Sequence, residues 1–288
     1  DLHRLIRRQR QMCIRDSPMV AINQWEQAED SMYTLCGKDR IHPSTDGHLV
    51  MAYLFLKAQG LAGKPVADIR IDGAGKKVTR SDNCRVSDLS VSSDNLTFTY
   101  EAKSLPYPID TSYYDNEKHT QADALSVIPF MDEMNYEGLS VSGLSDGYYG
   151  LTIGREFIGR FTARELERGI NMALLQNTPQ YKQAMKIRQM NEERWLKERK
   201  MREFYWVEYN LMRKTGMLWA CNEAAVDTLR KYRPHDIFLQ WNGDLWLQYM
   251  HKGIREDCVN EQQDLVNQIY EQNKPIPLRI EIKKFTDL

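Results

Sequence analysis

The spacing of hydrophobic and polar positions changes twice along the chain, and each change marks a different kind of structure. Residues 18–64 read as a loop followed by a helix. The helix is predicted over residues 47–59, where apolar side chains recur at helical spacing. Asp46 near its start and Gly60 directly after its end are typical start and stop signals.

Residues 65–161 carry short runs of β-forming residues separated by turn dipeptides. Asp72-Gly73 and Asp146-Gly147 are typical of the tight turns that join neighbouring strands. Short strands with such turns indicate a small β-sandwich. The predicted strands cover residues 66–71, 96–100, 139–141, 148–153 and 157–161, and a linker rich in Pro, Tyr and Asp is predicted over residues 104–120.

From residue 162 onwards the pattern is helical. Thr162 and Glu165 have the spacing of a capping box, in which each side chain bonds the other's backbone N–H at a helix start. Thr178-Pro179 places a cap and a first-turn proline in their preferred order. The predicted segments are a helix from Thr178 to about Thr215, a helix over 244–272 after an Asn242-Gly243 turn, and a terminal strand over 276–285.

The sequence therefore predicts an α/β protein with β-sandwich and α-helical parts, divided into residues 18–64, 65–161 and 162–288. Residues 1–17 fit none of these parts. Their string Gln11-Met12-Cys13-Ile14-Arg15-Asp16-Ser17 resembles a translated sequencing-adaptor remnant. We expect native sequence to begin near Pro18, although a basic, frayed terminus would read the same way.

Composition and charge exclude several classes of function. Thirty-nine Lys and Arg against forty Asp and Glu leave a net charge of −1, which gives no overall field for nucleic acid or an anionic membrane. No apolar run approaches the ~18–20 residues of a membrane-spanning helix. Five widely spaced cysteines without a CxxC pair fit neither a zinc knuckle nor a disulfide framework. We expect no cofactor, no metal and no nucleic-acid partner.

Candidate chemistry lies in the segment before the first predicted helix. Asp39 precedes His42 by three residues on a predicted tight turn, and Pro43 and Gly47 follow. This spacing lets the carboxylate reach one imidazole nitrogen, which fixes the tautomer and leaves the other nitrogen as a base. The alternative is that Asp39 caps the turn and His42 is a polar loop residue.

The run Asp39-Arg40-Ile41-His42-Pro43, followed by Gly47-His48 and the predicted helix, resembles the last block of SGNH/GDSL-type hydrolases. The segments Trp25-Glu26-Gln27 and Thr178-Pro179-Gln180-Tyr181 are similar to a bacterial branch of that family. The resemblance implies a remnant of a flavodoxin-like α/β core. It also implies that His42 is the general base and Asp39 its orienting carboxylate in a Ser-His-Asp triad, acting on a small ester or acetylated carbohydrate.

One part of the family pattern is missing. None of the residues before Asp39 forms the Gly-Asp-Ser nucleophile block, so we expect a truncated C-terminal portion that is inactive by itself. The family branch is exported, so a periplasmic or secreted location is expected, and the oligomeric state stays open. The rival hypothesis is a non-catalytic module that binds a glycan or a protein.

Four weaker signals have simpler explanations. Gly143-Leu144-Ser145-Asp146-Gly147 matches a nucleophile elbow, but the β pattern that follows favours a hairpin turn. Asp39, His42, Asp46 and His48 resemble a metal site, although His48 fits a helix start. Basic residues interleaved with aromatics between Thr178 and Thr215 could indicate nucleic-acid binding, but the aromatic spacing favours packing in a helix. The residues predicted to face the core are Phe204, Tyr205, Val207, Tyr209, Leu211 and Met212. Trp219, Trp241 and Trp246 fit either a ligand surface or buried anchors.

Overall fold

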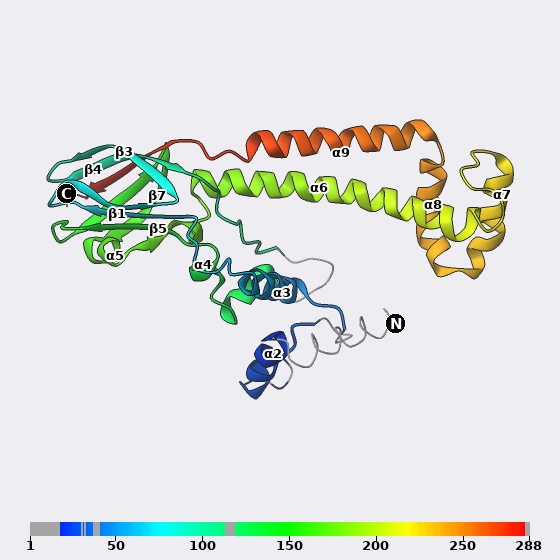
Figure 1. The fold of residues 1–288 in the computed structure, drawn as a ribbon, viewed down its shortest axis with the longest axis horizontal. Coiled ribbons are helices and arrows are strands. Elements are labelled where there is room, and N and C mark those ends of the chain that lie inside the picture. The colour runs from blue at the N-terminus through cyan, green and yellow to red at the C-terminus, as the bar shows by residue number, and fades with distance from the viewer. Residues whose placement is uncertain (1–17, 30, 32, 37–40, 113–118, 286–288) are drawn as a thin grey trace. The chain divides into compact units, whose positions relative to one another are not determined.

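The computed structural model describes residues 18–29, 31, 33–36, 41–112 and 119–285. The chain divides into two compact units (Figure 1). The first contains residues up to 184 and the last segment from 275 onwards, and the second contains residues 185–274. Each unit has its own hydrophobic core.

Two sheets build the larger part of the first unit. One has the order β2-β1-β5-β8, with β1 and β5 parallel, and the other has the order β3-β4-β9-β6-β7. The four-stranded sheet consists of β2 Lys77–Asp82, β1 Ala67–Asp72, β5 Glu137–Ser142 and β8 Ile170–Asn171. The five-stranded sheet consists of β3 Cys84–Val91, β4 Asn95–Ala102, β9 Leu278–Lys284, β6 Tyr148–Ile153 and β7 Glu156–Thr162. The predicted strands are confirmed, and β2, β3 and β8 are additional.

Large apolar side chains from both sheets form one core. Ile69 and Leu139 come from the four-stranded sheet, and Phe98, Leu151 and Ile280 come from the five-stranded sheet, all fully buried. Alternate residues of each strand face this core, as a half-buried strand requires. The capping box is confirmed: Thr162 accepts from the backbone N–H of Glu165 at the start of α5 Ala163–Arg168.

The last strand lies in the interior of its sheet. β9 pairs with β4 on one side and β6 on the other, so Ile280 is opposite both Phe98 and Ile153 (Figure 1). The predicted terminal strand is therefore confirmed. Its position between two earlier strands means that the five-stranded sheet is complete only when the end of the chain is in place.

A buried polar bridge crosses from one sheet to the other. The Tyr100 hydroxyl of β4 donates to Glu137 Oε1 of β5 at 2.8 Å, and Gln180 Nε2 donates to the same oxygen at 3.2 Å. Glu137 is fully buried. Burial raises the pKa of this carboxyl to about 7, against the opposing effect of the two donated hydrogen bonds.

The segment before the sheets forms helices. α2 Pro18–Glu29 occupies a stretch that the sequence pattern predicts as loop, and this prediction is wrong. Pro18 stands at the first helical position and no further Pro or Gly interrupts the segment. α3 Thr45–Ala58 confirms the predicted helix. Apart from one isolated bridge, the described part of residues 18–64 holds no strand, so a flavodoxin-like core stays a prediction.

Small elements and a linker connect these helices to the sheets. Ile128 and Phe130 pack with Leu49, Val50 and Tyr53 of α3 in a separate apolar cluster. The connecting elements are the 3-10 turn η1 Gln121–Ser126 and the short helix α4 Phe130–Glu133. No helix or strand occupies residues 104–112 or 119–120, the described residues of the predicted linker.

The second unit is helical. α6 Pro179–Val207 enters it from the first unit and continues as a π-helical turn over Glu208–Met212. The other helices are α7 Glu223–Tyr232, α8 Ile237–Tyr249 and α9 Lys252–Gln272. α6 and α9 lie side by side, joined by a 2.7 Å ion pair between Lys197 Nζ and Glu261 Oε2 (Figure 1).

The predicted turn at Asn242-Gly243 is wrong, because α8 runs through it and the break comes after Tyr249. Asp236 caps α8 by accepting from two backbone N–H groups. Trp246 and Tyr249 lie on its buried face. The Arg233 side chain packs closely against Gly243, since a Cβ at this position would lie 3.2 Å from Arg233 Nε.

Among the described residues, no helix combines the length and the apolar character of a membrane span.

Candidate functional site

The candidate general base lies at the entrance to α3. His42 is exposed and precedes Pro43, which forms an isolated antiparallel bridge with Cys36. This bridge brings Pro43 beside Cys36, and His42 directly precedes the bridged proline. Asp39 lies outside the described residues, so the expected Asp39–His42 contact stays a prediction.

Buried polar groups hold the entrance to α3 in place. The backbone N–H and the hydroxyl of Ser44 both donate to the Leu35 carbonyl at 3.1 Å. The Ser44 hydroxyl also bonds the Asp46 carboxylate, which accepts a further bond from the Gly47 N–H at 2.8 Å. Ser44 and Asp46 are almost fully buried. A carboxylate in the first turn is also stabilised by the helix dipole, so Asp46 fixes the turn that carries His42.

Gly47 is required by close approach rather than by an unusual backbone angle. A Cβ at this position would overlap the Leu35 carbonyl oxygen, the acceptor for Ser44. The glycine in the motif therefore lets the first turn of α3 press against the preceding segment.

Replacing Gly47 with alanine should destabilise the first unit by about 1–3 kcal/mol, the usual cost of forcing an extra methyl into a packed site. Urea unfolding of the full chain measures this effect. Gly253→Ala is the matched control, because a Cβ there meets nothing within 4 Å. Equal stability of Gly47→Ala and the parent chain would contradict the close approach.

A second histidine reaches the same buried carboxylate. His119 Nδ1 lies 3.6 Å from Asp46 Oδ2, and its side chain is half-exposed. Tyr33 lies nearby, and burial together with the charges of Asp46 and Glu26 raises its pKa to about 12. Sequence reasoning missed His119, which lies near the end of the predicted linker and belongs to no motif. Its pairing with Asp46 comes only from the packing of this segment against α3.

The described members of the Asp39, His42, Asp46 and His48 set, which was weighed as a metal site and set aside, do not form a metal-binding group. His48 is exposed on α3, Asp46 bonds Ser44 and Gly47, and Asp39 is outside the described range. Within that range no group of three or more His, Cys, Asp or Glu side chains could hold a metal ion.

Large apolar side chains are exposed around the motif. Trp25 of α2 is 76% exposed, Ile41 beside His42 is 74% exposed, and Phe55 of α3 is 64% exposed. Met51 of α3 is also exposed. Isolated exposed apolar residues are ordinary, but several on neighbouring elements are typical of a surface that contacts another polypeptide or a ligand.

Ser145 lies in a turn between two strands. β5 ends before it and β6 begins at Tyr148, so no helix follows as a nucleophile elbow requires. The predicted hairpin is nevertheless wrong, because β5 and β6 belong to different sheets and do not pair with each other, so the turn connects the two sheets. Lys284 Nζ donates to Ser145 Oγ at 2.8 Å, and the Tyr149 hydroxyl donates to the Ser145 carbonyl at 2.9 Å. These contacts fasten the turn to β9 and β6.

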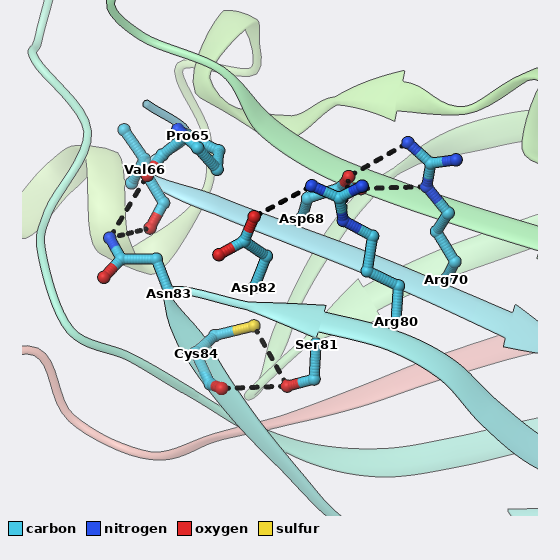
Figure 2. Close-up of polar contacts among 9 residues, drawn as sticks. All are labelled: Pro65, Val66, Asp68, Arg70, Arg80, Ser81, Asp82, Asn83 and Cys84. Atoms are coloured by element: carbon cyan, nitrogen blue, oxygen red, sulfur yellow. Dashed lines mark hydrogen bonds and ion pairs between the residues drawn. The ribbon is translucent and has the colours of Figure 1, made fainter. Parts of the chain in front are cut away.

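The first strand begins in a cluster of charged side chains (Figure 2). Asp68, almost fully buried, faces Arg70 and Arg80, whose guanidinium nitrogens lie 3.0 and 2.8 Å from Asp68 Oδ2. Arg80 also bonds Asp82, and Asn83 donates to the carbonyls before β1 (Figure 2). Two arginines and two carboxylates balance in charge, and their ion pairs anchor β1 to β2.

Comparison with known proteins gives two matches. A family model described as the diltiazem deacetylase C-terminal helical domain matches residues 185–274. These are the residues of the second compact unit. A search of curated proteins gives no significant match.

A solved structure, described as a gut microbial diltiazem-metabolizing enzyme, is similar to nearly the whole chain. The two are 40% identical with a TM-score of 0.90, and the match covers 98% of this chain. The chain spans 66% of the length of that structure. This chain therefore has an enzyme as its structural neighbour, and its mixed α/β architecture has a known counterpart.

Proposed function

We propose that this chain is the part of an ester hydrolase that carries the general base His42 and its orienting carboxylate Asp39. The observation that carries the proposal is the 40% identity, over 98% of the chain, to a diltiazem-metabolizing enzyme. The match of the helical unit to a deacetylase domain supports the same class, because a deacetylase that acts on an ester transfers an acetyl group to water.

The finer mechanism follows from the resemblance of residues 39–48 to the SGNH/GDSL family. A serine hydroxyl attacks the ester carbonyl while His42 takes its proton, and His42 then passes that proton to the departing alcohol. The resulting acyl-enzyme is attacked by water, which His42 deprotonates, and acetate leaves as the serine regains its proton. Asp39 holds the imidazole in the tautomer that this proton transfer needs.

The nucleophile in this proposal comes from polypeptide other than the described residues. Two observations support it. The chain matches only 66% of the length of its solved neighbour, and apolar side chains are exposed on α2, α3 and beside His42. A further layer of polypeptide over these elements would cover Trp25, Ile41 and Phe55 and bring a serine to the His42 imidazole.

The expected substrate is a small acetyl ester or an acetylated carbohydrate. Ester hydrolysis by this route needs only the serine, the base and donors for the oxyanion, so the reaction class does not depend on the alcohol part. The diltiazem named for the neighbour is the first substrate to try.

A chimera tests the proposal directly. The part of the solved neighbour that this chain does not match is joined to residues 18–288, and acetate release is measured with p-nitrophenyl acetate and with diltiazem. We expect turnover by the chimera and none above background by the 288-residue chain. Turnover by the chain alone that survives His42→Ala would contradict the assignment, as would an inactive chimera that folds.

A further inference from the structure

The helical unit contains a pocket that the proposed reaction does not use. Its volume is about 380 Å³, within the range of roughly 300–1,000 Å³ typical of small-molecule sites. It lies between the end of α6, the π-helical turn and the start of α8. Its walls include Trp206, Asn210, Lys214, Tyr232, His235 and Asp236.

The π-helical turn over Glu208–Met212 shapes one wall. Such turns are rare in proteins, and those that occur are often found at functional sites. The extra residue in the turn shifts the side chains that follow it. Glu208 is fully buried and fixes the turn by accepting from the Trp219 N–H and from Trp246 Nε1, both at 2.8 Å. Asn210 and Leu211 of this turn line the pocket.

Aromatic rings extend from the pocket onto the surface. The Trp206 ring, which lines the pocket, lies 5.2 Å from that of Phe238, and Phe238 lies 5.4 Å from Trp241. Trp241 is 67% exposed, whereas Trp246 is fully buried. Of the tryptophans that sequence reasoning considered for a ligand surface, Trp241 is therefore beside the pocket and Trp246 is a packing residue.

The polar groups of the pocket are mixed in kind and balanced in charge. Lys214 and His235 have side chains without a hydrogen bond or ion pair in the described part of the chain. The Asn210 side-chain amide donates to the Trp206 carbonyl, and Asp236 Oδ1 caps α8 by accepting from backbone N–H groups. The Asn210 side-chain oxygen and Asp236 Oδ2 stay available as acceptors. One lysine and one aspartate favour neither an anion nor a cation.

We propose that this pocket binds a neutral saccharide, with one sugar ring inside and the next along Phe238 and Trp241. A sugar hydroxyl both donates and accepts, which fits Lys214 and His235 beside the acceptor oxygens of Asn210 and Asp236. The C–H face of a sugar ring is apolar and packs on an aromatic face. This binding site is separate from the ester-hydrolase proposal, so either can fail without the other.

Calorimetric titration of the 288-residue chain with cellohexaose, xylohexaose, mannohexaose and maltohexaose tests the proposal. We expect saturable binding of at least one of them. Trp241→Ala and Lys214→Ala should each weaken that binding roughly tenfold or more, as truncating a central contact does. Trp195→Ala is the matched control, because Trp195 is also exposed on this unit but lies outside the pocket lining.

Three results would overturn the inference. They are no binding of any neutral hexasaccharide at millimolar concentration, binding that Trp241→Ala leaves unchanged, and stronger binding of choline or hexagalacturonate than of every neutral probe. Trp241 and Lys214 are surface residues, so circular dichroism should show that both variants keep the helical content of the parent chain.

Discussion

Replacing His42 with alanine in the active chimera should lower kcat for p-nitrophenyl acetate by about 10²–10⁴-fold, the usual contribution of a positioned general base. The serine then keeps its proton at neutral pH and is a poor nucleophile. The binding of the ester should change little, because His42 acts on the proton rather than on the acyl group. Steady-state kinetics separate these effects, since a loss in kcat with a steady KM is the signature of a missing transition-state interaction.

Two companion variants make this result specific. His48→Ala removes another exposed histidine from the same motif region, and its kcat should stay close to that of the parent chimera. Asp39→Asn should lose activity through the wrong imidazole tautomer while leaving the fold intact. An equal loss in His42→Ala and His48→Ala would show that the region matters only for structure. Activity retained in His42→Ala would remove this residue from the mechanism.

Local signals in the sequence predict the elements of this fold well. Asp46 and Gly60 mark the ends of α3 within two residues, and the Thr162–Glu165 capping box forms as expected. Both depend on contacts within a single helical turn. The strand β6 matches its predicted bounds because alternating side chains and a preceding Asp-Gly turn act over a few residues.

Contacts between distant segments could not be predicted. The position of β9 between β4 and β6 depends on which side chains fill the shared core, and no local pattern specifies its partners. At Asn242-Gly243 the turn signal was overridden, because the buried face of α8 continues through Trp246. Exposed Tyr205 and Tyr209 contradict the prediction that both face the core, since they pack edge-on against Trp219 at the surface.

In the candidate site, too, local features could be predicted from the sequence and contacts between distant segments could not. His42 and Gly47 were singled out by spacing, and the structure gives Gly47 a physical reason. Asp46 was considered as a helix start signal and as a metal ligand, and the structure shows that it is also the buried group that holds the turn. His119 approaches it from a segment that has no motif of its own. Burial of a polar side chain depends on the whole fold, so a sequence pattern alone cannot reveal it.

The stability of the first unit should fall as the pH rises from about 5 to 8, because Glu137 must lose a proton inside the core. Its pKa is raised to about 7 in the folded chain from an ordinary value of 4.5. The folded state therefore holds this proton more tightly than the unfolded chain does. The stabilisation is complete below pH 4.5 and is lost as the pH rises through 7.

The size of the effect follows from the same pKa values. At 1.36 kcal/mol per pH unit, a rise from 4.5 to about 7 corresponds to roughly 3 kcal/mol. The hydrogen bonds agree with a neutral carboxyl. In the described structure Glu137 Oε2 and Gln180 Oε1 are buried acceptors without a partner. A proton on Oε2 turns one of these two acceptors into a donor.

Glu137→Gln isolates this contribution from the other titrating groups. The amide keeps an oxygen for the Tyr100 hydroxyl and carries N–H donors where the acid would hold its proton, and it stays neutral at every pH. Urea unfolding at pH 5 and pH 8 should therefore show a loss of stability in the parent chain that exceeds the loss in the variant by about 3 kcal/mol. Glu101→Gln, which changes a half-exposed carboxylate on β4, should leave the pH dependence as it is. Parallel pH profiles for Glu137→Gln and the parent would mean that Glu137 is ionised in the folded core. The hydrogen bonds from Tyr100 and Gln180 would then offset the cost of burying that charge.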